Sequence, residues 1–130
     1  MIEISDEKKK RIGFIEGGKF YDKKRKILGF LENRVVKIIN AKTNLRLDEH
    51  YNIYAGKDEV GFIYSSKIYF REKPIYEISP EKGEIKTIDG KRGLFLTGND
   101  EKIDLLLLFA IAVVFLESKW WDLVFTSFRF

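Results

Sequence analysis

The 130-residue sequence predicts one mainly β domain: a closed antiparallel barrel of about twelve short strands around a hydrophobic C-terminal helix. Two observations predict this fold. A hairpin pattern repeats every sixteen residues between about residues 2 and 96, and an uninterrupted apolar run lies near the C-terminus. Hydrophobic residues make up 45% of the chain and aromatic residues 15%, which argues against disorder. No Pro-rich linker divides the chain, so we expect a single domain over residues 1–130.

The repeat consists of two apolar runs separated by turns. Three tetrapeptides at 12–15, 28–31 and 60–63 share an apolar residue, Gly, Phe and a second apolar residue, and the same phase predicts strands at 44–47, 76–79 and 92–95. Half a period away lie the runs 2–4, 20–21, 35–39, 53–54, 68–70 and 85–88. Turn-forming pairs such as Gly17-Gly18, Asn33-Arg34 and Ser65-Ser66 separate the runs. This alternation predicts six strands in each phase, in an antiparallel meander.

Spacing alone does not distinguish a closed barrel from a sandwich of hairpins. We favour closure, because an open sheet of many short strands leaves two edges exposed. A barrel of more than about eight strands has a lumen that something must occupy.

Residues 105–116 are apolar on every side, so a helix there must be buried in a protein core or in a bilayer. The run is shorter than the about 20 residues that span a membrane, which favours a core helix. We expect this helix over about 101–118, with Asn99 or Asp100 as its N-cap, Asp104 and Glu117 bounding the apolar run, and its axis along the barrel.

The sequence Asn-Asp-Glu-Lys-Ile-Asp at 99–104 leads into this apolar run, which closes on Glu117. The acidic start, apolar centre and acidic end resemble the C-terminal helix of LURP-one-related proteins in the tubby-like superfamily. That superfamily also takes in the tubby C-terminal domain and the phospholipid scramblases. The resemblance implies a twelve-stranded barrel around the helix. A YD- or MORN-like hairpin array is the alternative, but it does not explain an apolar helix.

Several kinds of chemistry are excluded or disfavoured. Cysteine is absent and His50 is the only histidine, so thiol chemistry, histidine triads and multi-histidine metal sites are excluded. The oxygen-rich cluster at Asn99, Asp100, Glu101 and Asp104 could hold calcium, but it lacks EF-hand spacing and helix capping explains it. We therefore expect a non-enzyme with no catalytic residue, metal, cofactor or small-molecule substrate.

Charge is distributed unevenly between the two ends that a meander would have. The turns expected at one end hold fourteen basic and seven acidic residues, a balance of +7, whereas the turns at the other end balance to −2. The helix would leave the barrel at the basic end and carry an aromatic tail, residues 120–130, with it. The predicted binding residues are Lys8, Lys9, Lys10, Arg11, Lys23, Lys24, Arg25, Lys26, Trp120 and Trp121.

These residues support three hypotheses. The first is docking to anionic membrane lipid or to an acidic protein partner, because lysines attract anionic headgroups and Trp prefers the membrane interface. The second is nucleic-acid binding, in which Phe20, Tyr21 and Tyr69 would stack on bases. The third is a structural role in which the tail packs on another subunit. Solvated turns and a tail that caps the barrel are the alternative reading of the same residues.

A cytoplasmic location, peripheral at the membrane, fits the absence of cysteine. The first eleven residues are polar and lack the apolar core of a secretory signal.

Overall fold

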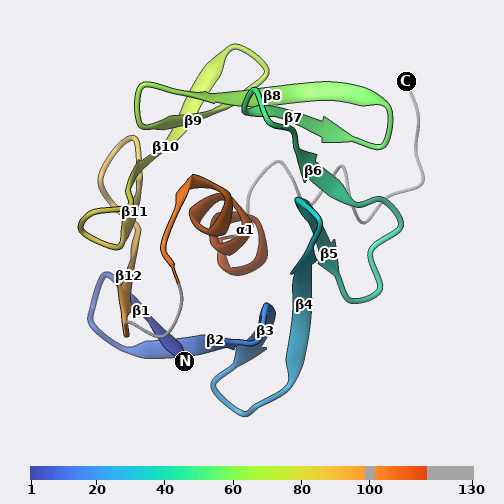
Figure 1. Ribbon diagram of the computed structural model, residues 1–130. Helices are drawn as coiled ribbons and strands as arrows, with labels where there is room; N and C mark the ends of the chain where they lie inside the picture. Colours follow the sequence, from blue (N-terminus) through green and yellow to red (C-terminus); the bar gives the residue numbers. More distant parts are fainter. Residues whose placement is uncertain (99–101, 117–130) are drawn as a thin grey trace.

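The computed structural model of the chain describes residues 1–98 and 102–116, which form a β-barrel with a helix inside it (Figure 1). The first six strands are β1 (Ile2–Asp6), β2 (Arg11–Glu16), β3 (Lys19–Asp22), β4 (Ile27–Glu32), β5 (Val35–Ile38) and β6 (Leu45–Leu47). The second six are β7 (Asn52–Ala55), β8 (Asp58–Tyr64), β9 (Lys67–Phe70), β10 (Lys73–Ser79), β11 (Glu84–Thr87) and β12 (Gly93–Thr97). The predicted twelve strands are confirmed in both phases.

Each strand pairs antiparallel with its neighbours in sequence, and β1 pairs with β12 to close the barrel. The closing register runs from Glu3 opposite Thr97 to Asp6 opposite Leu94. Closure removes both sheet edges, and this favours a barrel over a sandwich of hairpins. The predicted closed meander is confirmed.

Three of the five turns at one end are short and need unusual backbone conformations. The β2–β3, β4–β5 and β8–β9 turns have two residues each, and both residues have positive φ: Gly17 and Gly18, Asn33 and Arg34, Ser65 and Ser66. Turns of this kind match the right-handed twist of a hairpin. The other two turns at this end have four residues each, and the six turns at the opposite end have from two to six residues.

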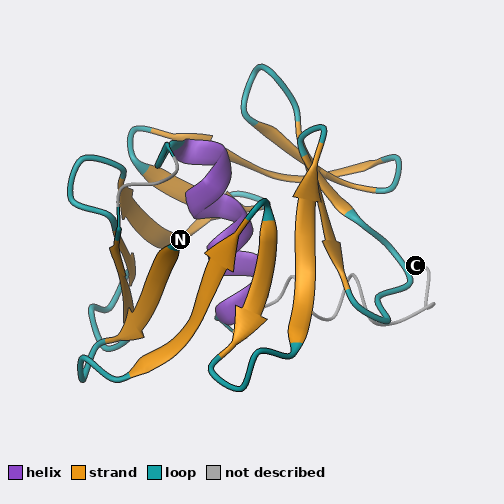
Figure 2. Ribbon diagram, turned by 60° about the horizontal axis from the view of Figure 1, so that its bottom comes forward, coloured by secondary structure: helices purple, strands orange, loops and turns teal. Residues whose placement is uncertain are grey.

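The helix α1 spans Leu105–Phe115 and runs through the barrel beside the strands (Figure 2). Its N-cap is Asp104, whose backbone is extended and whose Oδ1 accepts a hydrogen bond of 2.9 Å from the Leu107 N–H. The expected start at about residue 101, with Asn99 or Asp100 as cap, is therefore wrong. Asp104 is nearest to the apolar run and satisfies one of the free amides of the first turn. Residues 99–101 and the predicted end at 118 lie outside the described residues.

The helix fills the barrel. Eight consecutive residues, 107–114, are buried, and eight residues cover more than two turns of helix, so its whole circumference is enclosed. The strands surround it with inward-facing aliphatic side chains, among them Ile4, Ile15, Leu47, Ile68 and Ile85. No buried polar or charged residue occurs in the described core. The prediction of a central apolar helix is confirmed.

Two of the three glycines in the sixteen-residue motif, Gly13 and Gly29, have a steric cause. A Cβ placed on Gly13 would meet the backbone oxygen of Tyr21 and, at 2.6 Å, the ring of Phe115 in α1. A Cβ on Gly29 would meet the backbone oxygen of Lys37 and the Cα of Ile38 at 3.2 Å. At both positions the neighbouring strand comes so close that only glycine fits.

We expect Ala110→Lys and Ala112→Lys each to abolish folding. Both alanines are fully buried on opposite sides of α1, and neither site offers a partner for a charge. Ala110→Leu, which adds only volume, should destabilise by about 1–3 kcal/mol. Thermal melting followed by circular dichroism tests this, with Tyr64→Lys on the exposed surface as the control. A near-native melt of either lysine variant would contradict the enclosed helix.

We expect Gly29→Ala to destabilise the barrel by about 1–3 kcal/mol, because the methyl group would press on backbone rather than on a movable side chain. Gly93→Ala is the matched control, since its nearest atom, the oxygen of Ile85, lies 3.3 Å away. Urea unfolding of the two variants gives the comparison. Equal loss of stability in both would show that the close strand approach is not the cause.

Candidate functional site

The two barrel ends differ in charge. Six turns lie at the end that we call the basic end, and they comprise residues 7–10, 23–26, 39–44, 56–57, 71–72 and 88–92. These turns hold twelve basic and three acidic residues, a net charge of +9. The five turns between strands at the opposite end hold two basic and three acidic residues, a net charge of −1. The predicted segregation of charge follows from the observed topology.

Most of this charge is concentrated in four neighbouring turns. Because β12 pairs with β1, the turns 88–92, 7–10, 23–26 and 39–44 follow one another around the rim, and we call them the basic arc. The arc holds ten of the twelve basic residues at this end. The lysines predicted from the sequence therefore do come together.

An aspartate shapes the turn that follows β1. The Oδ1 atom of Asp6 accepts hydrogen bonds from the backbone N–H groups of Lys8 at 2.9 Å and Lys10 at 3.0 Å. The Lys9 N–H donates to the Asp6 backbone oxygen at 2.9 Å, and Lys9 has a φ of 64°. An Asp that bonds the backbone two residues ahead stabilises such turns. The turn is therefore fixed by its backbone, and all three lysine side chains are exposed.

The turn after β3 repeats this construction at Asp22. Its Oδ1 accepts from the N–H groups of Lys24 at 2.8 Å and Lys26 at 2.9 Å, and Arg25 takes the positive φ of 70°. The two turns are neighbours on the rim, since β2 pairs with β3. They present equivalent sets of cationic side chains side by side.

Acidic side chains in and beside the arc bond to the barrel's own backbone. Besides Asp6 and Asp22, Glu7 Oε1 accepts from the Gly93 N–H at 3.0 Å, and Asp89 Oδ1 accepts from the Lys91 N–H at 2.9 Å. Among residues 1–98 and 102–116, no lysine of the turns 7–10 and 23–26 forms an ion pair. The acids thus stabilise the turns and do not pair with these lysines in the part of the chain that the structure describes.

The two predicted arginines occupy a different position from the lysines. Arg11 and Arg25 both lie over the Phe14 ring, 5.3 and 5.4 Å from its centroid, and Arg11 also pairs with Glu3 at 3.7 Å. Phe14 stacks on Tyr21 at 4.8 Å. The arginines thus cover an aromatic pair on the outer wall, which is a structural role.

Of the three aromatic side chains expected to stack on bases, one is buried and two stack on a neighbouring ring of the barrel. Phe20 is fully buried inside the barrel, so its predicted role in nucleic-acid binding is wrong. Tyr21 stacks on Phe14, and Tyr69 stacks on Phe62 with ring centroids 4.5 Å apart. Successive side chains of a strand point to opposite faces of the sheet, so only one of Phe20 and Tyr21 in β3 can face outward. Phe20 is the one that faces the core.

The C-terminal end of α1 reaches the basic end, as the topology predicts. There it lines a hollow of about 420 Å³ together with residues of β2, β4 and the β11–β12 turn. The lining includes Ile12, Leu28, Arg92, Phe115 and Leu116. Trp120 and Trp121 of the predicted site lie outside the described residues.

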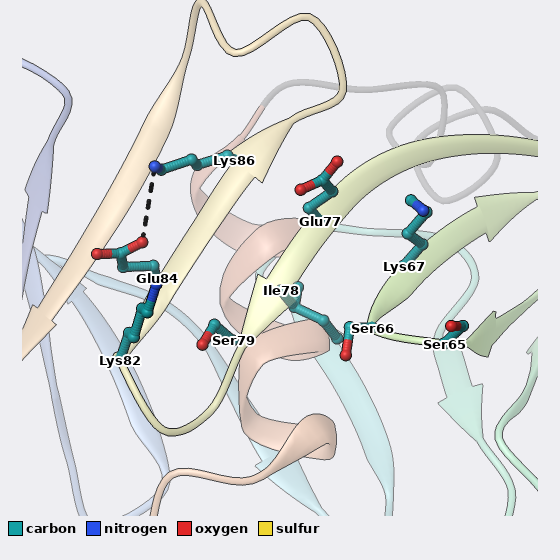
Figure 3. Close-up of a pocket in the computed structure, with 9 residues that line it drawn as sticks. All are labelled: Ser65, Ser66, Lys67, Glu77, Ile78, Ser79, Lys82, Glu84 and Lys86. Carbon is teal, nitrogen blue, oxygen red and sulfur yellow. Dashed lines mark ion pairs between the residues drawn. The ribbon is translucent and has the colours of Figure 1, made fainter.

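A second depression, of about 250 Å³, lies on the outer wall over β9, β10 and β11 (Figure 3). Lysines, glutamates and serines line it, and Lys86 pairs with Glu84 at 3.7 Å. Its opposing charges nearly cancel. In residues 1–98 and 102–116 no group of three or more His, Asp or Glu is arranged to hold a metal ion.

Comparisons with protein-family models, curated proteins and solved structures find no match to this chain. Within the described part of the chain, no helix is both long enough and apolar enough to cross a membrane.

We expect Asp89 to make the basic end sensitive to acid. The backbone N–H of Lys91, and then the hydroxyl of Thr87, lower the pKa of Asp89 below its ordinary value of 3.8. A lowered pKa stabilises the fold above the ordinary pKa, and this contribution is lost as the pH falls through the lowered value. Asp89→Asn keeps an acceptor but cannot titrate. The melting temperature of the parent should therefore fall more steeply than that of the variant below about pH 4; parallel curves would contradict this.

Proposed function

We propose that this chain is a non-enzymatic binding module that docks on anionic phospholipid membranes through its basic end. One observation carries the proposal: the acids of the basic arc bond to the barrel backbone, and the lysines of its two central turns have no ion-pair partner among the described residues. Each lysine near an anionic membrane contributes about 1 kcal/mol of attraction. A rigid rim with many such lysines suits a broad anionic surface.

The shape of the basic end supports the same function. The lysines are carried on short turns whose backbone is already ordered, so binding loses little conformational freedom. They form an arc on one rim rather than lining an enclosed pocket, which suits many headgroups better than one small ligand.

The resemblance to the tubby-like superfamily agrees with this proposal. A twelve-stranded barrel around an apolar helix is the architecture which that resemblance implies. We also propose that the chain belongs to this superfamily. This proposal supports membrane docking, and binding experiments can test it.

We expect the double variant Lys8→Gln, Lys24→Gln to bind anionic vesicles about thirty-fold more weakly than the parent. Removing two lysines removes about 2 kcal/mol of attraction. The two residues hold equivalent places in equivalent turns, and their substitution leaves the bonds to Asp6 and Asp22 intact, because these use backbone N–H groups. Co-sedimentation with vesicles of phosphatidylcholine and phosphatidylserine measures the change.

The matched control is Lys67→Gln with Lys82→Gln, which removes two positive charges near the opposite end. It should bind as the parent does. Binding of the parent should also weaken as salt is raised, because exposed charges are screened. Equal binding of the parent to vesicles with and without phosphatidylserine would refute the proposal.

A further inference from the structure

The basic end also exposes hydrocarbon. Ile39 is 37% exposed and Ile88 is 42% exposed. The other two large hydrophobic side chains exposed to a similar degree in the described residues are Tyr51 at 41% and Tyr64 at 69%, and both lie toward the opposite end. Tyrosine has a hydroxyl that can bond to water, whereas isoleucine has none. Among the large hydrophobic side chains that the structure describes, purely aliphatic exposure is therefore confined to the basic end.

The two isoleucines flank the lysine-rich turns. Ile88 opens the turn 88–92 and Ile39 opens the turn 39–44, and these are the first and last turns of the basic arc. The turns 7–10 and 23–26 lie between them. Along the rim, the order is thus one aliphatic side chain, two lysine-rich turns and a second aliphatic side chain.

Both residues are held in place by the barrel. The Ile39 N–H donates to the Leu28 oxygen at 3.0 Å, and the Ile88 N–H donates to the Ile75 oxygen at 3.3 Å. Each bond continues a strand ladder by one residue beyond the strand. The exposed side chains are therefore fixed features of the rim, at the level where the turns begin.

We propose that Ile39 and Ile88 insert between the lipids of an anionic bilayer while the lysines between them contact the headgroups. This inference rests on the proposed function and adds a second, hydrophobic component to it. Charge complementarity selects the surface, and burial of aliphatic side chains in hydrocarbon strengthens the attachment. A single-stranded nucleic acid fits this rim less well, because isoleucine offers bases no aromatic face for stacking.

The absence of cysteine allows a direct test. A nitroxide label is attached to Ile39→Cys, to Ile88→Cys and, as control, to Tyr64→Cys at the opposite end. On vesicles of phosphatidylcholine and phosphatidylserine, the labels at 39 and 88 should gain exposure to oxygen and lose exposure to a water-soluble relaxation agent. The label at 64 should remain in water. Labels at 39 and 88 that stay in water on bound protein would overturn the inference.

Affinity provides an independent readout. Ile39→Ser and Ile88→Ser should each weaken binding to these vesicles about tenfold, even at salt concentrations that screen the lysines. Tyr64→Ser, the matched control, should not. Thermal melting checks that each variant folds as the parent does, which is expected for exposed positions.

The outcomes separate the two proposals. Parent protein that binds anionic vesicles, together with serine variants of unchanged affinity, would overturn the insertion and leave electrostatic docking standing. Parent protein that does not prefer anionic vesicles would overturn both. Binding to a single-stranded polynucleotide but not to vesicles would also overturn both, in favour of nucleic acid.

Discussion

Enclosure of α1 is the constraint on which the rest of the structure depends. A twelve-stranded barrel cannot fill its lumen with strand side chains alone, and an apolar helix cannot remain in water. Each element thus supplies what the other lacks: the helix provides the core, and the strands cover residues 107–114 on all sides. Interiors pack at near-crystal density, so strand count, strand length and helix diameter must match. Where Phe115 approaches β2, the match leaves room only for Gly13.

The turns at the two ends of the barrel differ in length and in charge. At one end, three of the five turns have two residues, both with positive φ, which leaves few side chains to vary. At the basic end, four of the six turns have four to six residues, and three of these use an aspartate to bond their own amides. Two of these turns, 7–10 and 23–26, carry three lysines each. The positive charge is therefore concentrated in the longer turns of the basic end.

The sequence made the strands predictable and the site only partly so. All twelve strands follow from the repeat, because the apolar runs recur about every sixteen residues even though the turns differ in length. The helix start was missed because several capping residues precede the run and only contact with Leu107 selects Asp104. The lysines could be predicted from their runs. The Glu7–Gly93 bond could not, since it joins residues far apart in sequence. The exposure of Ile39 and Ile88 could not either, since each ends a run that also holds a buried aliphatic residue, Val36 or Ile85.

The acids of the basic arc explain how a stable rim can carry so much positive charge. Clustered lysines repel one another, and surface ion pairs would relieve that repulsion at the expense of the charge available for binding. Here the carboxylates of Asp6, Asp22 and Asp89 accept hydrogen bonds from backbone N–H groups of the turns. Their negative charge lies close to the lysines of turns 7–10 and 23–26. Among the described residues, however, these carboxylates form no ion pair with those lysines. The residues that order each turn thus make no ion pair with the lysines of turns 7–10 and 23–26 within residues 1–98 and 102–116.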